Sequence, residues 1–199
     1  DSPSNRKKAI DVSKFICKEL NIEIDYTALT LKHIPQKRNI PSDEEIVYAF
    51  NNFQRCVNNS IAFINRKATA VKKYKLIFGL LAVYGLRPRE IINKPDLDWI
   101  VSPDNLHETF KVHESNKTGY REVFPFVPEW IELFDLKNLE AIQLLKDYTD
   151  ENDSAKVLSQ KVAFISRAFN RYNISLQPYD LRHACAIRAH LQGMPIKAA

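Results

Sequence analysis

Apolar residues recur at helical spacing over most of the chain. In residues 6–20 they fall every three or four positions, which predicts an amphipathic helix whose apolar face needs a partner. A second helix is predicted to start at Ser42, whose side chain forms a capping box with Glu45, and to continue through Phe53. Further helices are predicted over 62–81, 129–134, 138–148, 154–172 and 178–192.

Between residues 97 and 126 the pattern changes to short runs separated by turn residues. The runs 97–101, 109–113 and 121–126 predict three strands, the last two joined by a turn at 116–119. The predicted fold is therefore mainly α with a small three-stranded antiparallel β-sheet, an α+β arrangement in which the sheet interrupts a helical domain.

Composition restricts the class of protein. The 199 residues, 45% of them hydrophobic, suffice for one good-sized domain or for one domain and a fragment of another. Lysine and arginine outnumber the acidic residues by 29 to 24, which modestly favours a polyanionic partner. Cys17, Cys56 and Cys185 lack the spacing of a zinc site or a disulfide scaffold. No signal peptide or long apolar run is evident, so we expect a cytoplasmic protein with no membrane contact.

The first segment that suggests chemistry ends the helix predicted over 62–81. Gly85 can end that helix in a left-handed conformation, Arg87 follows, and Glu90 lies one helical turn beyond Arg87. An arginine directly behind so apolar a helix is expected to be partly buried and held by Glu90. The alternative is an ordinary helix end followed by a surface arginine.

The second segment is the predicted hairpin tip. Lys117 lies on the turn and Arg121 on the returning strand, so the turn can bring an ammonium group to a phosphate. Lysines on hairpin tips more often serve only solubility, and this segment alone does not decide between the two interpretations.

The third segment opens the helix predicted over 178–192. Tyr179, Arg182 and His183 fall at positions i, i+3 and i+4 and share one face, behind the acidic Asp180 of the first turn. The N-terminus of a helix that carries these side chains is a reasonable phosphate site. The alternative is a capped helix with a Tyr–Arg stacking pair.

Together and in this order, the three segments resemble the catalytic core of the tyrosine recombinases, the phage-integrase family. The resemblance covers roughly residues 38–199 and implies that family's catalytic-core fold. Residues 1–37 then resemble the C-terminal remnant of a core-binding (SAM-like) domain plus its linker. Both ends of the chain are expected to be the ends of a fragment.

The resemblance also implies roles for the site residues. Arg87 and Arg182 would hold the scissile phosphate, and Lys117 would protonate the departing 5′ oxygen. Glu90 and His183 would support the two arginines. The implied reaction is site-specific DNA recombination through a 3′-phosphotyrosyl intermediate, as in DNA integration by phages and mobile elements, with no metal and no cofactor.

Two departures from the family pattern stand out. Tyr179 occupies a position that usually holds histidine, and a phenol is the poorer base at neutral pH. The family's nucleophilic tyrosine lies well downstream of the second arginine, whereas only seventeen residues follow Arg182 here. We therefore expect this chain to be a fragment that lacks the nucleophile and is inactive alone.

The expected partner is double-stranded DNA, bound by a homo-oligomer (a tetramer on recombining DNA) when the protein is full-length. The main alternative is a non-catalytic DNA-binding module derived from an integrase. A type IB topoisomerase is a second alternative, which fits the spacing less well. The plainest alternative is a basic helical interaction domain without a functional site. Phosphate contacts, or alternatively a merely solvated helix face, are expected from a set of basic residues: Arg66, Lys67, Lys72, Lys73 and Arg121.

Overall fold

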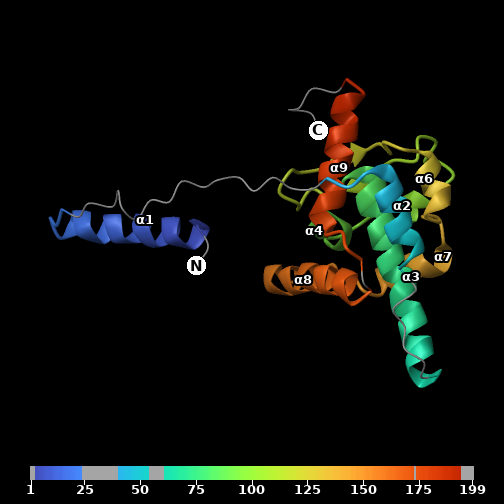
Figure 1. The fold of residues 1–199 in the computed structure, drawn as a ribbon, viewed down its shortest axis with the longest axis horizontal. Helices are drawn as coiled ribbons and strands as arrows, with labels where there is room; N and C mark the ends of the chain where they lie inside the picture. The colour runs from blue at the N-terminus through green and yellow to red at the C-terminus, as the bar shows by residue number, and fades with distance from the viewer. Residues whose placement is uncertain (1–2, 24–39, 54–60, 173, 194–199) are drawn as a thin grey trace. The chain divides into compact units, whose positions relative to one another are not determined.

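A computed structural model describes residues 3–23, 40–53, 61–172 and 174–193, with the side chains of α1 described from Lys8 and those of α3 from Thr69. The chain divides into two compact units, Asp1–Arg38 and Asn39–Ala199, and each is considered by itself. Figure 1 shows the ribbon of both units. The connector predicted at 21–41 lies mostly outside the described residues.

The first unit contains helix α1 (Pro3–Glu19), as the spacing of apolar residues predicts. The side chains of Val12, Phe15 and Ile16 are at least half exposed, from 50% for Ile16 to 67% for Phe15, whereas Ile10 is partly buried. The identity of this unit as the end of a core-binding domain stays a prediction.

The second unit is built around helix α3 (Ile61–Tyr84), the longest helix of the described residues. Helix α3 packs against six others, and Figure 1 shows it beside α9, with α8 running across its direction. Apart from α3 itself, the helices of this unit are α2 (Asp43–Asn51), α4 (Pro88–Ile92), α5 (Leu97–Ile100), α6 (Glu129–Leu133), α7 (Leu139–Lys146), α8 (Ala155–Arg171) and α9 (Pro178–Leu191).

The core of this unit lies where α3 meets its neighbours. Every residue of α3 from Leu76 to Tyr84 is buried, which explains why this stretch is apolar all round rather than on one face. Aromatic rings from α2, α3 and α8 pack together there: the centroid of Phe78 lies 6.0 Å from that of Phe50 and 5.6 Å from that of Phe169. The packing fixes α3, and α3 ends at the loop that begins the candidate site.

The helix starts follow the local sequence signals. Ser42 accepts a hydrogen bond from the backbone N–H of Glu45 (3.2 Å), and the Glu45 carboxylate accepts one from the Ser42 N–H (2.8 Å), which confirms the predicted capping box. Asp180 accepts the backbone N–H of Gln177 (2.8 Å) at the start of α9. These bonds satisfy donors that the first turn of a helix leaves without partners.

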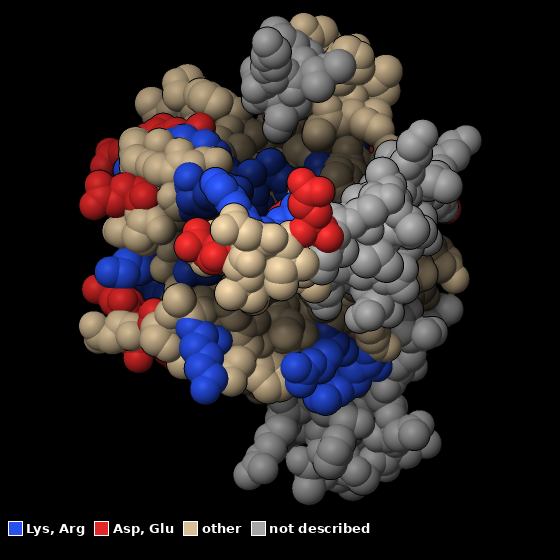
Figure 2. Space-filling view, turned by 90° about the vertical axis from the view of Figure 1, so that its left-hand side faces the viewer, with Lys and Arg blue, Asp and Glu red and all other residues tan. Residues whose placement is uncertain are grey.

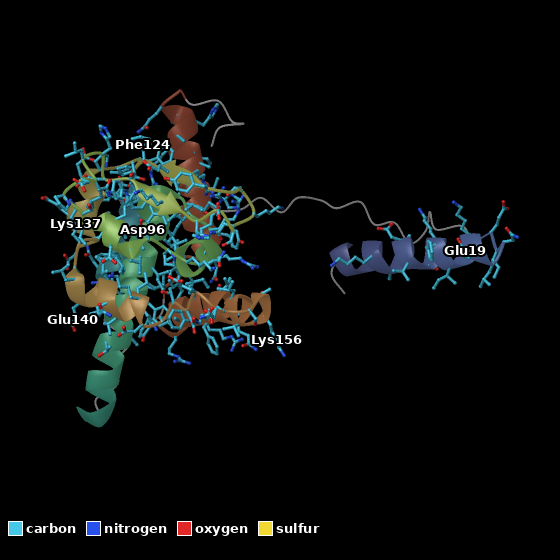
Figure 3. All side chains as sticks on the ribbon, turned by 180° about the vertical axis from the view of Figure 1, so that it is seen from behind. Glu19, Asp96, Phe124, Lys137, Glu140 and Lys156 are labelled. Carbon is cyan, nitrogen blue, oxygen red and sulfur yellow. The ribbon has the colours of Figure 1, made fainter. Side chains whose placement is uncertain are left out.

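The predicted three-stranded sheet has two strands, β1 (Phe110–Val112) and β2 (Arg121–Val123), which pair antiparallel. The first of the three runs predicted as strands, 97–101, forms helix α5 instead, so the prediction of a strand there was wrong. The side chain of Asp96, labelled in Figure 3, accepts the Trp99 backbone N–H (3.1 Å) and starts the helix, while Leu97 and Ile100 are buried one turn apart. A good N-cap and burial at i, i+3 outweighed the β-propensity of the run.

Within the described residues, no helix combines the length and apolar character needed to cross a bilayer.

Candidate functional site

The candidate site begins at the end of α3, where Gly85 turns the chain. Gly85 has φ +59°, in the left-handed region that the sequence predicts for it. A Cβ added at Gly85 would lie 2.6 Å from the Sγ of Cys185 on α9. Glycine is therefore required here both by the backbone conformation and by the close approach of α9.

Helix α9 carries Arg182 to the same turn. The guanidinium of Arg182 donates a hydrogen bond to the backbone carbonyl of Gly85, across 97 positions of sequence. Burial lowers the pKa of Arg182, and the nearby positive charge of Arg87 lowers it further. The first and third segments singled out in the sequence therefore meet in space.

Glu90 is the buried centre of the site. It lies in the first turn of α4, and 2% of it is exposed. Its carboxylate accepts hydrogen bonds from the backbone N–H of Arg87 (2.8 Å) and from the Arg87 guanidinium (2.8 Å). Burial by itself would raise the pKa of Glu90, but the bonds from Arg87 and Arg121 outweigh burial and hold the pKa below its usual value. The expectation that Glu90 holds Arg87 is thus met in the geometry.

The hairpin between β1 and β2 reaches the same carboxylate. Arg121 donates to Glu90 (2.9 Å) through one terminal nitrogen and to the hydroxyl of Thr118 through the other. A second tie joins α4 to the hairpin, because the side-chain amide of Asn93 donates to that of Asn116 (3.1 Å), both residues being buried. Lys117 lies exposed on the tip between these anchored residues.

The remaining predicted residues of the third segment lie on the first turns of α9. Tyr179 is 48% exposed, whereas His183 is partly buried. Tyr179 precedes Arg182 by one helical turn, so the two share a face as the spacing predicts. The structure thus gives Tyr179 access to solvent at the edge of the site.

Of the basic residues expected to contact phosphates, Lys72 and Lys73 pack against other parts of the unit, as Arg121 does. Lys72 forms an ion pair with Glu140, labelled in Figure 3, at the start of α7. The Nζ of Lys73 lies 3.7 Å from the ring centroid of Tyr148. The side chains of Arg66 and Lys67 lie outside those that the structure describes. On the face drawn in Figure 2, several basic side chains gather around a hollow near the middle, with acidic side chains at its rim and along one edge.

Sequence reasoning missed two contributors to this site. Neither Thr118 nor Asn93 stands in a recognisable motif, and both act through contacts that span more than twenty positions. The pairing of Arg121 with Glu90 was also unforeseen, because Arg121 reads as one more basic residue on a strand. Among the described residues there is no cluster of His, Cys, Asp and Glu that could hold a metal ion.

Comparison with known proteins found two relatives in Nostoc sp. (strain PCC 7120). The chain is 43% identical to Excisase C over 197 residues, 98% of the chain and 40% of that protein. It is 36% identical to Excisase A over 189 residues, 92% of the chain and 39% of that protein. The chain therefore spans about two fifths of the length of these relatives. It matches no protein-family profile and no solved structure.

Proposed function

We propose that this chain forms the phosphate-binding core of a tyrosine-type site-specific recombinase, which cuts and rejoins double-stranded DNA through a 3′-phosphotyrosyl intermediate. The observation that carries the proposal is the hydrogen bond from Arg182 to the carbonyl of Gly85. It brings two arginines that are 95 positions apart in the sequence, Arg87 and Arg182, to one turn of the chain. The relationship to two proteins named excisases agrees with an activity in DNA excision.

The charges at this turn favour an anionic ligand. Arg87, Arg121 and Arg182 face one carboxylate, that of Glu90, so the cluster carries two more positive charges than negative ones. The repulsion between Arg87 and Arg182 that lowers the pKa of Arg182 would be relieved by a bound phosphate. Guanidinium groups bind phosphate oxygens through two parallel hydrogen bonds, and they stay charged throughout the reaction.

In the proposed cleavage step a tyrosine oxygen forms a bond to phosphorus while the bond from phosphorus to the 5′ oxygen breaks. Arg87 and Arg182 stabilise the negative charge that builds on the non-bridging oxygens. The ammonium group of Lys117 donates a proton to the departing 5′ oxygen, and the proton of the attacking phenol passes to solvent or to a nearby base. Rejoining reverses these transfers, so neither a metal nor ATP is required.

Tyr179 is not proposed as the nucleophile. It precedes Arg182 by one turn of α9 and is 48% exposed, so its hydroxyl can donate a hydrogen bond to a phosphate held by Arg182. We assign the attacking tyrosine to a position beyond residue 199 in the gene product and expect the active form to be a homo-oligomer on DNA. A DNA-binding module without cleavage activity is the second candidate, because Tyr179 replaces a better base.

The test uses the complete gene product and a nicked DNA substrate carrying the suspected recombination site. Cleavage beside the nick releases a short oligonucleotide, so the covalent protein–DNA product cannot be rejoined and accumulates on a denaturing gel. Peptide mapping then identifies the attached tyrosine. We expect an adduct on a tyrosine beyond residue 199.

Three variants sharpen this test. Arg87→Ala and Arg182→Ala should each reduce adduct formation at least about 100-fold, because each removes a stabilising group of the transition state, while DNA binding weakens only modestly. Arg89→Ala is the matched control, since Arg89 is an exposed arginine on the same short helix as Glu90. Cleavage retained in either of the first two variants contradicts the proposed clamp. No adduct from the unaltered protein, together with salt-dependent binding to the site, supports the non-catalytic module instead.

A further inference from the structure

The hydrogen bonds of Glu90 extend well beyond Arg87. Its two carboxylate oxygens accept from the backbone and side chain of Arg87, from the guanidinium of Arg121, and from the hydroxyl of Thr118 at 3.5 Å. Two carboxylate oxygens offer about four acceptor positions, so the acceptor capacity of Glu90 is fully used. One buried carboxylate thus joins the turn after α3 to a hairpin some thirty positions further on.

Arg121 is held by this arrangement on both sides. One of its terminal nitrogens donates to Glu90 and the other to Thr118, which itself contacts Glu90. The side chain of Arg121 is only 30% exposed. The two bonds fix the orientation of the Arg121 guanidinium, which a solvated surface cation would not have, while leaving the rest of its five N–H donors available.

In the sequence, Lys117 lies between two residues that take part in these contacts. It is flanked by Asn116, which is buried and bonded to Asn93, and by Thr118, which is bonded to Arg121. The two neighbours of an otherwise exposed lysine are thus fixed to α4 and to its acidic residue. A general acid must be held within hydrogen-bond reach of the oxygen it protonates, and a loop position is held less precisely than one on a helix or strand unless its neighbours are anchored.

We infer that Arg121 is a positioning residue that, through Glu90 and Thr118, fixes the tip bearing Lys117 relative to Arg87. The catalytic part of this inference rests on the proposed function, whereas the coupling of the hairpin to the arginine turn does not. Arg121→Ala leaves three side-chain ties between the hairpin and the α4 segment: the bonds from Asn93 to Ser115 and to Asn116, and the 3.5 Å contact of Thr118 with Glu90. The hairpin then keeps its fold but loses the connection through which the tip is aligned.

The coupling is measured by hydrogen exchange on this chain, whether or not it cleaves DNA. Arg121→Ala should speed amide exchange both in the hairpin (115–121) and in the turn with α4 (85–92), since Glu90 loses one of its two arginine partners. Arg121→Lys should restore part of the protection, and Arg89→Ala should leave both segments unchanged. Thr118→Val, which keeps the side-chain shape, is the second variant should Arg121→Ala fold poorly. Unchanged exchange at 85–92 in both Arg121→Ala and Thr118→Val overturns the inference.

The positioning of Lys117 is measured by the chemistry of the leaving group in the complete gene product. A substrate with sulfur in place of the bridging 5′ oxygen leaves as a thiolate and needs no proton, because a thiol is far more acidic than an alcohol. Arg121→Ala should slow cleavage of the oxygen substrate about 10- to 100-fold and that of the sulfur substrate less than about threefold. Arg87→Ala should slow both alike. Equal slowing of the two substrates by Arg121→Ala refutes the role of Arg121 through Lys117.

The two proposals fail in different ways. If the unaltered protein forms no adduct on either substrate, the proposed function fails, and the exchange experiment still decides whether Arg121 couples the hairpin to the turn. If adducts form and Arg121→Ala cleaves the oxygen substrate at the normal rate, the recombinase proposal stands and the positioning role is refuted.

Discussion

Replacing Gly85 by alanine tests the contact on which the candidate site depends. Gly85 has φ +59°, and an added Cβ would lie 2.6 Å from Sγ and 3.0 Å from Cβ of Cys185. The substitution therefore strains the turn and pushes α9 away from it. Arg182 belongs to α9 and donates a hydrogen bond to the carbonyl of Gly85, so a displacement of α9 separates Arg182 from Arg87 directly.

The magnitude follows from two separate costs. A left-handed backbone costs a residue other than glycine roughly 1–2 kcal/mol. Forcing one extra methyl group into a packed contact costs about 1–3 kcal/mol more. Gly85→Ala should thus lower the free energy of unfolding by about 2–5 kcal/mol, which corresponds to a fall in Tm of about 4–20 °C for a domain of this size.

The chain supplies a matched control in Gly119. Gly119 also has a left-handed φ (+71°), but a Cβ added there would meet nothing within 4 Å. Gly119→Ala should therefore cost only the backbone strain, about 1–2 kcal/mol. Thermal and urea denaturation followed by circular dichroism measure both variants. The difference between the unfolding free energies of the two variants gives the cost of the steric contact between the new methyl group and α9.

A double variant completes the design. Cys185→Ala removes the sulfur that the new methyl group would meet, so Gly85→Ala should cost less in that background than alone. Equal destabilisation by Gly85→Ala and Gly119→Ala, with no recovery in the double variant, would mean that α9 does not approach the turn as described.

Three further outcomes are expected. Glu90→Gln should lower the free energy of unfolding by about 1–3 kcal/mol at pH 7, as measured by urea denaturation. Burial opposes the ionisation of Glu90, but the bonds from Arg87 and Arg121 hold its pKa below the unfolded value of 4.5. The difference in unfolding free energy between Glu90→Gln and the unaltered protein should therefore shrink as the pH falls through the folded-state pKa. A constant difference from pH 7 to pH 3 would contradict the assigned bonds. Cys185 is buried, and burial raises the pKa of its thiol to about 12. Alkylation of Cys185 by iodoacetamide at pH 8 should therefore require unfolding. Rapid labelling of the native chain would count against the packing of α9. Ser42→Ala should cost about 1 kcal/mol in the same denaturation assay because α2 loses its N-cap, and a neutral result would show that the capping box is dispensable.

Features set by neighbouring residues could be predicted from the sequence. The capping box at Ser42, the left-handed turn at Gly85 and the bond between Glu90 and Arg87 each involve residues within four positions of one another. The long apolar run likewise located α3, because so many consecutive apolar residues can be buried only in a core.

The run 97–101 shows where local signals compete. Its aromatic and β-branched residues favour a strand, but Asp96 behind a proline is a helix start, and Leu97 and Ile100 are spaced for one buried helical face. The short length of α5 gives the helical period too few positions to be recognised. Tertiary burial decided between two nearly balanced propensities.

The contacts that assemble the site could not be predicted one by one. The bonds from Arg182 to Gly85 and from Arg121 to Glu90 span 97 and 31 positions, and no local pattern encodes the geometry of such pairs. Only the order of three motifs along the chain indicated that they belong together. The roles of Lys117 and Tyr179 in chemistry stay predictions.

The span of 97 positions between Gly85 and Arg182 also governs when the arginine pair can exist during the life of the molecule. Domains generally fold from the N-terminus as the ribosome makes them, at about 5–20 residues per second, so α9 emerges roughly 5–20 s after the turn it must reach. Until then Arg87 lacks Arg182, the second arginine of the proposed clamp. Under the proposed function, the complete arginine pair would therefore be available to a phosphate only after synthesis has passed this segment.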